Sequence, residues 1–124
     1  MIHGTGIDIL KTDKLTFVSE RADDPFIVRT FTASEREAAD GRELPLYFYA
    51  TRFAGKEAVF KALRISGEDV DLSEIEILND KKGAPYVNLY GKLKDYAMEN
   101  GLKIHISLSY EDDMAIAMAI AEKM

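Results

Sequence analysis

The chain has 124 residues, 47% hydrophobic and 31% charged, so we expect one globular domain covering residues 1–124. With 16 basic and 22 acidic residues the net charge is −6, which argues against general binding of nucleic acid or of an anionic membrane. The absence of cysteine excludes disulfides and thiolate chemistry, and the longest charge-free apolar run, Met114 to Ala121, is too short to span a bilayer. Because the N-terminal segment has neither a basic region nor an apolar signal core, we expect a cytoplasmic protein.

Hydrophobic spacing and turn residues predict alternating runs of helix and strand. The predicted elements are, in chain order, a strand over 2–10, helical pieces within 12–31, a helix from 32 to about 41, the longest helix from 45 to about 64, a hairpin with strands at 74–78 and 85–89, a short helix at 93–97, and strands at 104–109 and 114–121. The expected fold class is therefore α+β, with helices covering an antiparallel sheet.

The last predicted strand has two contrasting faces. Residues 114, 116, 118 and 120 are methionine or isoleucine, whereas residues 115, 117, 119 and 121 are all alanine. An alanine face lets another backbone approach closely, either a helix of this chain or a neighbouring subunit.

Glu57 is the most informative residue of the longest predicted helix, because it falls in the middle of an apolar stripe. A carboxylate in that position is unfavourable unless it is neutralised or paired. Glu57 is therefore either a partner in a salt bridge at the edge of the core, or a metal ligand or general base. The stripe consists of Leu46, Tyr49, Ala50, Phe53, Phe60 and Leu63.

Asp8 is the second candidate carboxylate, and it lies between Ile7 and Ile9 in the first strand. By itself Asp8 is better interpreted as a helix N-cap or an exposed strand residue than as a functional carboxylate. Asp8 and Glu57 together would form a hard-oxygen site of the kind that Mg²⁺ occupies with phosphates and waters.

Other polar clusters have both a structural and a functional interpretation. The basic residues on the helix of Glu57 form either a solvated face or a phosphate site; they are Arg52, Lys56, Lys61 and Arg64. His105, Ser107 and Ser109 share one strand face, and a polar sheet face or pocket wall is favoured over nucleophilic catalysis because no third group orients the histidine.

Three segments in this order resemble the holo-acyl-carrier-protein synthase family, the small single-domain type of 4′-phosphopantetheinyl transferase. They are Gly4–Ile9, Arg52–Ala58 with the following Lys61–Leu63, and Ile106–Ser109. The resemblance implies an α+β homotrimer with active sites between subunits. It also implies a magnesium-dependent transfer of phosphopantetheine from coenzyme A to a serine of an apo acyl carrier protein, with adenosine 3′,5′-bisphosphate as the other product.

The resemblance also implies roles for individual residues. Asp8 and Glu57 would hold Mg²⁺, Glu57 would act as the base for the serine proton, and Lys61 would contact phosphate. The residues that would line the coenzyme A pocket are Arg52, Lys56, Lys61, Gly83, Pro85, His105 and Ser107.

Tyr110 departs from the family pattern, because many members have histidine at this position. Two alternatives therefore stay open beside an active transferase. One is a relative that binds coenzyme A or a carrier protein without transferring the arm. The other is a trimeric structural protein in which Asp8 and Glu57 are merely ion-paired.

Overall fold

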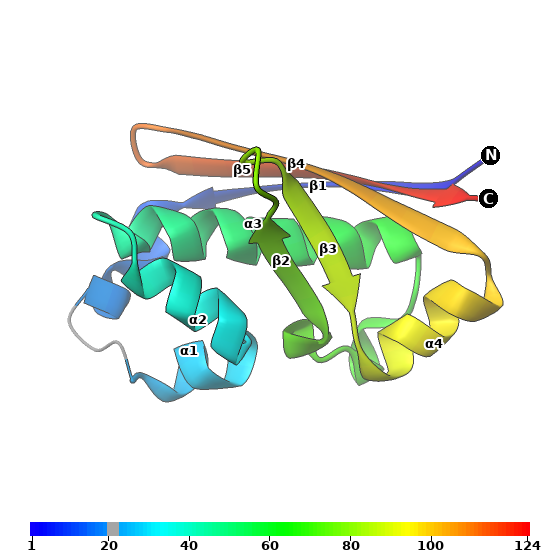
Figure 1. The fold of residues 1–124 in the computed structure, drawn as a ribbon, viewed down its shortest axis with the longest axis horizontal. Coiled ribbons are helices and arrows are strands. Elements are labelled where there is room, and N and C mark those ends of the chain that lie inside the picture. Colours follow the sequence, from blue (N-terminus) through cyan, green and yellow to red (C-terminus); the bar gives the residue numbers. More distant parts are fainter. Residues whose placement is uncertain (20–22) are drawn as a thin grey trace.

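The computed structural model describes residues 1–19 and 23–124, and it shows helices packed on antiparallel sheets (Figure 1). The elements are, in chain order, β1 (Ile2–Lys11), a 3₁₀ segment (Thr12–Ser19), α1 (Pro25–Thr30), α2 (Ala33–Asp40), α3 (Pro45–Leu63), two 3₁₀ turns (Gly67–Asp69 and Leu72–Glu74), β2 (Ile75–Asn79), β3 (Pro85–Leu89), α4 (Gly91–Glu99), β4 (Leu102–Glu111) and β5 (Met114–Lys123). One sheet has the order β1-β5-β4 and the other is the hairpin β2-β3. The predicted α+β class is confirmed.

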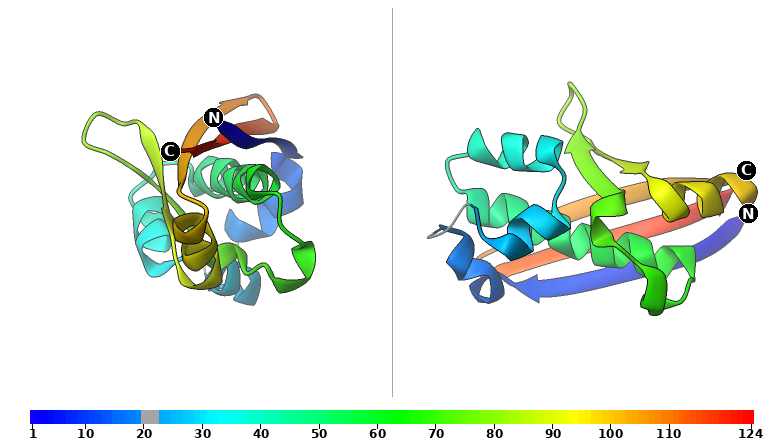
Figure 2. Two further views of the ribbon diagram at one scale, coloured as in Figure 1. Left: turned by 90° about the vertical axis from the view of Figure 1, so that its right-hand side faces the viewer. Right: turned by 90° about the horizontal axis from the view of Figure 1, so that it is seen from below.

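Helix α3 lies along one face of the three-stranded sheet. Helices α1, α2 and α4 lie on the side of α3 that faces away from this sheet (Figure 1 and, end-on, Figure 2). Gly4 and Gly6 of β1 permit this close contact, since a Cβ atom on Gly6 would overlap the carbonyl oxygen of Ala58. The alanine face of β5 is fully buried in the same layer. Of the two partners predicted for the alanine face, the structure therefore shows the helix of the same chain.

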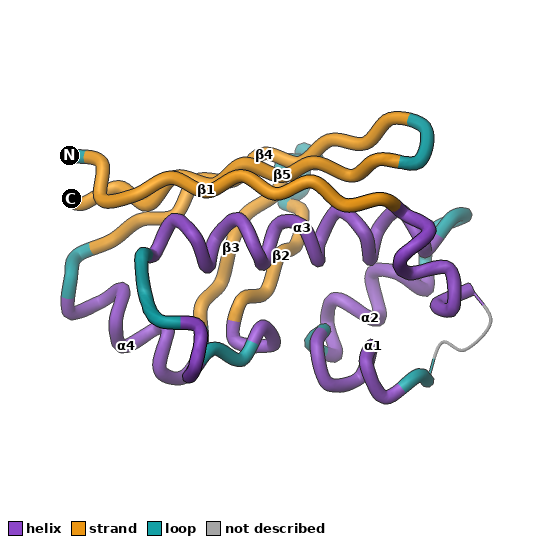
Figure 3. Tube along the Cα trace, turned by 180° about the vertical axis from the view of Figure 1, so that it is seen from behind, coloured by secondary structure: helices purple, strands orange, loops and turns teal. Residues whose placement is uncertain are grey.

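The opposite face of this sheet carries exposed apolar side chains. Ile7 and Ile9 of β1, with Ile116 and Met118 of β5, are between 38% and 64% exposed. No helix or strand of the described residues covers these four side chains, which we call the outer sheet face (Figure 3). Exposed apolar patches of this kind mark interaction surfaces.

The apolar stripe predicted on α3 differs from the observed packing. Phe53 and Phe60 of the stripe are only partly buried, whereas Ala54 and Ala58 are completely buried. The difference arises because the sheet and the remaining elements cover α3 from several sides, so that small residues face the sheet. Glu57 consequently lies at a margin of the buried surface and not at its centre.

The other predicted elements begin and end close to the expected residues. Helix α1 starts at Pro25, and the capping box of Thr32 and Glu35 opens α2. The β2-β3 hairpin turns through Gly83, whose φ of 87° favours glycine. Among the described residues, no helix is both long and apolar enough to cross a membrane.

Candidate active site

Asp8 and Lys61 meet at the edge of the sheet formed by β1. Alternation along β1 turns Asp8 toward α3 and turns Ile7 and Ile9 to the outer face, as predicted. The Nζ of Lys61 donates to Asp8 Oδ1 at 3.2 Å and to the backbone oxygen of Ile7 at 2.9 Å. The side chains of Lys61 and Asp8 are 49% and 20% exposed, so a ligand can reach this ion pair.

Glu57 precedes Lys61 by one helical turn and is partly buried. Burial raises the pKa of Glu57 above its ordinary value, the charge of Asp8 raises it further, and Lys61 opposes both effects. The three residues therefore form a cluster with two carboxyl groups and one ammonium group. Such a cluster favours a bound cation, which relieves the repulsion between Asp8 and Glu57.

The donor atoms of this cluster fit Mg²⁺ only with help from a ligand. Among the residues that the structure describes, no group of three or more His, Cys, Asp or Glu could hold a metal ion. Mg²⁺ is commonly bound by one or two carboxylates together with substrate phosphates and waters. Asp8 and Glu57 supply the two carboxylates, so the site suits a metal that binds together with a phosphate group.

A second feature is a pocket of about 380 Å³ beside β4, which we call the β4-edge pocket. Arg52, Gly83 and Pro85 line it, and all three were predicted to contact coenzyme A. His105 and Ser107 do not line the pocket.

Arg52 is the principal charged group of the β4-edge pocket. Its side chain is 7% exposed, and its Nη2 donates to Asn79 Oδ1 at 2.7 Å while its Nη1 donates to Thr51 Oγ1 at 3.2 Å. The guanidinium lies over the ring of Phe48, 4.2 Å from the centroid. Its Nε is buried without a hydrogen-bond partner in the described structure.

Burial, together with the nearby charge of Arg42, lowers the pKa of Arg52 to about 10, against an opposing effect of Glu35. Arg42 lies over the ring of Phe48 as well, 5.2 Å from its centroid. Within the described residues no carboxylate forms a salt bridge with either guanidinium. The lining of the pocket also includes Glu43, but neither guanidinium is paired with it, so the two cations favour binding of an anion.

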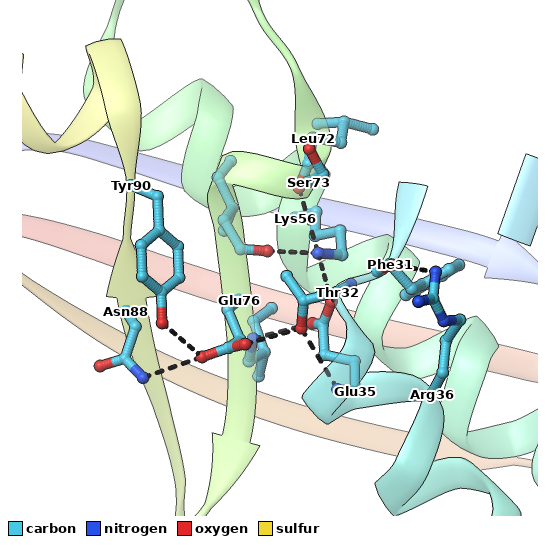
Figure 4. A network of polar contacts seen from close by, with 12 residues as sticks. Phe31, Thr32, Glu35, Arg36, Lys56, Leu72, Ser73, Glu76, Asn88 and Tyr90 are labelled. Atoms are coloured by element: carbon cyan, nitrogen blue, oxygen red, sulfur yellow. Dashed lines mark hydrogen bonds and ion pairs between the residues drawn. The ribbon is translucent and has the colours of Figure 1, made fainter. Parts of the chain in front are cut away.

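Lys56 lies in the interior of the protein and not at the β4-edge pocket. Its side chain is fully buried, and its Nζ donates to Glu35 Oε1 at 2.8 Å (Figure 4). The same ammonium group donates to the backbone oxygens of Leu72 and Ile75. With its donors used inside the protein, Lys56 does not line the β4-edge pocket, and its contact with coenzyme A stays a prediction.

The partner of Lys56 connects three elements. Glu35 Oε2 accepts from the backbone N–H of Ile77 in β2 at 2.8 Å, and Oε1 accepts from the N–H of Thr32 at 2.9 Å. Thr32 Oγ1 in turn donates to Glu76 Oε2 at 2.6 Å (Figure 4). This network fixes α2, α3 and β2 to one another.

Glu76 ends the network on the side of β3. Burial raises the pKa of Glu76, but hydrogen bonds from Thr32, Asn88 and Tyr90 outweigh burial and lower the pKa overall. Glu76 is thus held ionised by three donors. We assign the network from Lys56 to Glu76 to the support of α3.

His105 and Ser107 lie on the solvent-facing side of β4. His105 Nε2 contacts Glu122 Oε1 at 3.0 Å, and this contact lowers the pKa of Glu122. Both predicted residues therefore lie near the outer sheet face.

Apart from the buried Lys56, the predicted residues thus lie toward two opposite edges of the three-stranded sheet, because β1 and β4 are its edge strands. Ala58 and Lys61 of α3 face β1, whereas Gly55 faces β4 and β2. Arg52 and Glu57 are separated by about 140° around the helix axis. The carboxylates and the β4-edge pocket of one chain consequently face in different directions.

Arg42 and Tyr47 are candidate binding residues that the sequence reasoning missed. Both line the β4-edge pocket, together with Tyr110. The available signal was weak: Arg42 follows the helix-ending Gly41, and Tyr47 lies in the first turn of α3. Arg42 and Tyr47 become pocket residues only because β4, which is distant in the sequence, packs beside them and forms the opposite wall.

Comparisons with known proteins show the family of the chain. Residues 4–119 match the 4′-phosphopantetheinyl transferase superfamily. A holo-[acyl-carrier-protein] synthase of Syntrophus aciditrophicus is 38% identical over 124 residues, covering 98% of this chain and 97% of that protein.

Solved structures give the same result. A holo-[acyl-carrier-protein] synthase of Neisseria meningitidis is 31% identical with a TM-score of 0.87, covering 99% of this chain and 100% of that one. One from Bacillus anthracis in complex with CoA (3′,5′-ADP) is 31% identical with a TM-score of 0.80, covering 100% and 99% of the two chains. On the strength of its matched residues and of these relatives over nearly its whole length, the chain belongs to the 4′-phosphopantetheinyl transferase superfamily.

Proposed function

We propose that this protein is a holo-[acyl-carrier-protein] synthase, which transfers the 4′-phosphopantetheine arm of coenzyme A to a serine hydroxyl of an apo acyl carrier protein. The observation that carries the proposal is the cluster of Asp8, Glu57 and Lys61 at the β1 edge, in a chain whose relatives have that name. The cluster has the groups that attack on a diphosphate requires: a carboxylate base, a cation for phosphate, and donors for Mg²⁺.

In the proposed reaction the serine oxygen of the carrier forms a bond to the phosphorus that bears the pantetheine arm. The bond from that phosphorus to the bridging diphosphate oxygen breaks, and adenosine 3′,5′-bisphosphate leaves with the electron pair. Glu57 takes the serine proton, directly or through a water, and its raised pKa suits this task. Lys61 balances the negative charge that grows on the phosphate oxygens.

Asp8 and Glu57 would hold Mg²⁺ through their carboxylate oxygens. The ion would supply positive charge to the diphosphate. Lys61 keeps Asp8 oriented toward α3 through the 3.2 Å contact, and it shares the positive charge of the site.

The β4-edge pocket supports binding of coenzyme A at its phosphate-rich nucleotide end. Arg52 offers a buried cation with an unused Nε, and Gly83 and Pro85 form the adjacent wall. His105 and Ser107 remain proposed coenzyme A contacts, because their place on exposed β4 leaves them accessible to a ligand that spans two copies.

The separation of the two edges supports an assembly in which copies share sites. The carboxylates at β1 of one copy would meet the β4-edge pocket of the next, a head-to-tail contact that closes into a ring. The outer sheet face provides apolar surface for such a contact. We propose the homotrimer that the family resemblance implies.

Intact-protein mass spectrometry tests the proposed function. Apo acyl carrier protein is incubated with this protein, coenzyme A and Mg²⁺, with parallel samples that contain EDTA. We expect a mass gain of one phosphopantetheine arm that is lost in EDTA. Binding of coenzyme A without modification of carriers from fatty acid, polyketide or peptide synthesis would reject the transferase in favour of a binding-only relative.

A cytoplasmic location also remains a prediction, which cell fractionation would check.

A further inference from the structure

Two tyrosine rings lie against each other in a tilted arrangement at the β4-edge pocket. Tyr47 in the first turn of α3 and Tyr110 near the end of β4 have centroids 4.8 Å apart and planes inclined by 32°. The hydroxyl of Tyr47 donates to the backbone oxygen of Asp112 at 3.1 Å, which ties Tyr47 to the turn after β4. The ring of Tyr47 is therefore held in place, and it supports Tyr110 from one side.

The exposure of Tyr110 is not required by the fold. Ile106 and Leu108 precede it at alternate positions of β4 and are partly buried toward α3, whereas Tyr110 continues this row and is 58% exposed. Its neighbour across the ladder is Ala115, which is small and buried. The ring of Tyr110 is thus largely exposed to solvent, and it packs against the ring of Tyr47.

The same pocket contains an independent indication of a ligand. Arg52 is more than nine-tenths buried, and its Nε lacks a hydrogen-bond partner in the described structure. Arg42 shares the ring of Phe48 with it. The lining of the pocket therefore includes cations that can bind a phosphate group and the ring of Tyr110, which can contact a planar group.

We propose that Tyr110, supported by Tyr47, stacks on the purine base of coenzyme A while Arg52 and Arg42 hold a phosphate of the same nucleotide. This inference rests on the proposed function for the identity of the nucleotide. Stacking requires only the π-face of the base, and an offset arrangement of rings is the favourable one. The phenol at position 110 then contributes affinity through its ring, and its hydroxyl is dispensable.

Calorimetric titration with two probes tests the stacking. Adenosine 3′,5′-bisphosphate carries both base and phosphates, and ribose 3,5-bisphosphate carries the phosphates alone. We expect Tyr110→Leu to weaken binding of the first probe by about 5- to 150-fold and to leave the second unchanged. Tyr110→Phe should bind both probes as the parent protein does. Tyr86→Leu is the matched control, since Tyr86 is an exposed tyrosine outside this pocket.

The kinetic readout separates binding from chemistry. In the transfer assay Tyr110→Leu should raise KM for coenzyme A, with kcat and the KM for the carrier protein unchanged. Equal weakening of both probes, or parent-like binding of the adenosine probe, would overturn the stacking role. Native mass spectrometry of Tyr110→Leu is the remaining check, because loss of assembly would assign the ring to a contact between copies instead.

These outcomes are distinct from failure of the proposed function. A protein that transfers no arm and still loses adenosine bisphosphate affinity on Tyr110→Leu retains the stacking site but is not a transferase. A parent protein that binds neither probe overturns the stacking site, whatever its transfer activity.

Discussion

The ammonium group of Lys61 lies 3.2 Å from Asp8 Oδ1, and this contact joins α3 to the free edge of β1 one helical turn from Glu57. Residues that are 53 positions apart in the sequence thereby form one charged cluster. The cluster is open to solvent on a well-packed helix, the combination that a site for an external phosphate requires.

Glu57→Gln tests the proposed base. We expect transfer to fall by about 10²- to 10⁴-fold, because the amide neither takes the serine proton nor contributes charge to a metal. The melting temperature should stay within a few degrees or rise. Glu99→Gln, at an exposed position of α4, is the control and should retain full transfer. Near-parental transfer by Glu57→Gln would remove Glu57 from the mechanism.

The pH dependence of Glu57 follows from its surroundings. Its pKa is raised by burial and by Asp8, so its proton is bound more tightly in the folded protein than in the unfolded chain. As the pH rises through the pKa of Glu57 in the folded protein, Glu57 ionises and the free energy of unfolding decreases. As the pH falls through the same pKa, Glu57 becomes protonated and can no longer act as a base. An NMR titration in EDTA should show the Glu57 carboxyl titrating above the unfolded-chain value.

Lys61→Met should raise the pKa of Glu57 still higher, because Lys61 is the group that lowers it. The same NMR titration of this variant measures the change. An unchanged or lower midpoint would contradict the electrostatic coupling between Glu57 and Lys61.

The buried pair of Lys56 and Glu35 should determine stability. Lys56→Met leaves Glu35 buried without its cation, at an expected cost of about 3–5 kcal/mol in the free energy of unfolding. Lys56→Met combined with Glu35→Leu should recover much of this loss. Urea denaturation measures both, with Lys92→Met at an exposed position as control. A Lys56→Met protein of parental stability that had lost coenzyme A affinity would instead support the predicted role of Lys56 in coenzyme A binding.

Sharing of sites between copies is testable by mixing two inactive proteins. Glu57→Gln and Arg52→Gln alter opposite edges of the sheet, so neither parent assembly has a complete site. If the two are unfolded and refolded together, about a quarter of the sites in a head-to-tail ring receive both intact edges. We expect the mixture to regain a matching fraction of transfer activity. No recovery in mixed assemblies verified by native mass spectrometry would place each site within one chain.

Met118→Lys tests the outer sheet face. A charge among Ile7, Ile9 and Ile116 should disperse the assembly to monomers, because burying the ammonium group without a partner is costly. Light scattering over a range of protein concentrations measures the effect. An assembly of unchanged size would exclude this face from the contact.

Local sequence patterns predicted most helices and strands and drew attention to Asp8 and Glu57, which the structure brings into one cluster. The features that were not predicted depend on contacts between segments that are distant in the sequence. The alternation of Ile7, Asp8 and Ile9 correctly separated the two faces of β1. The stripe on α3 was incomplete: its residues do pack against the core, but a helix covered on several sides has no single apolar face. The burial of Lys56 depends on Glu35 from another helix, which periodicity along α3 does not reveal.

The same limit applies to the two edges of the candidate site. That β5 lies between β1 and β4 is decided by pairings such as Gly4 with Ala121 and Ile104 with Ala121, across most of the chain. Without that order, Arg52 and Glu57 look like neighbours on one helix. The contact between the rings of Tyr47 and Tyr110 could not be predicted for the same reason.

The glycines of β1 and the alanines of β5 set how far Asp8 is from the helix that carries Glu57 and Lys61. Gly6 pairs with Ala119 and Asp8 pairs with Ala117, all on the side that meets α3. These small side chains allow α3 to approach the sheet closely enough for Lys61 to contact Asp8. A single methyl group added in this layer would therefore move α3 away from β1 and change the distances between Asp8, Glu57 and Lys61. The volume of buried residues that contact no substrate thus affects the chemistry of the charged cluster at the surface.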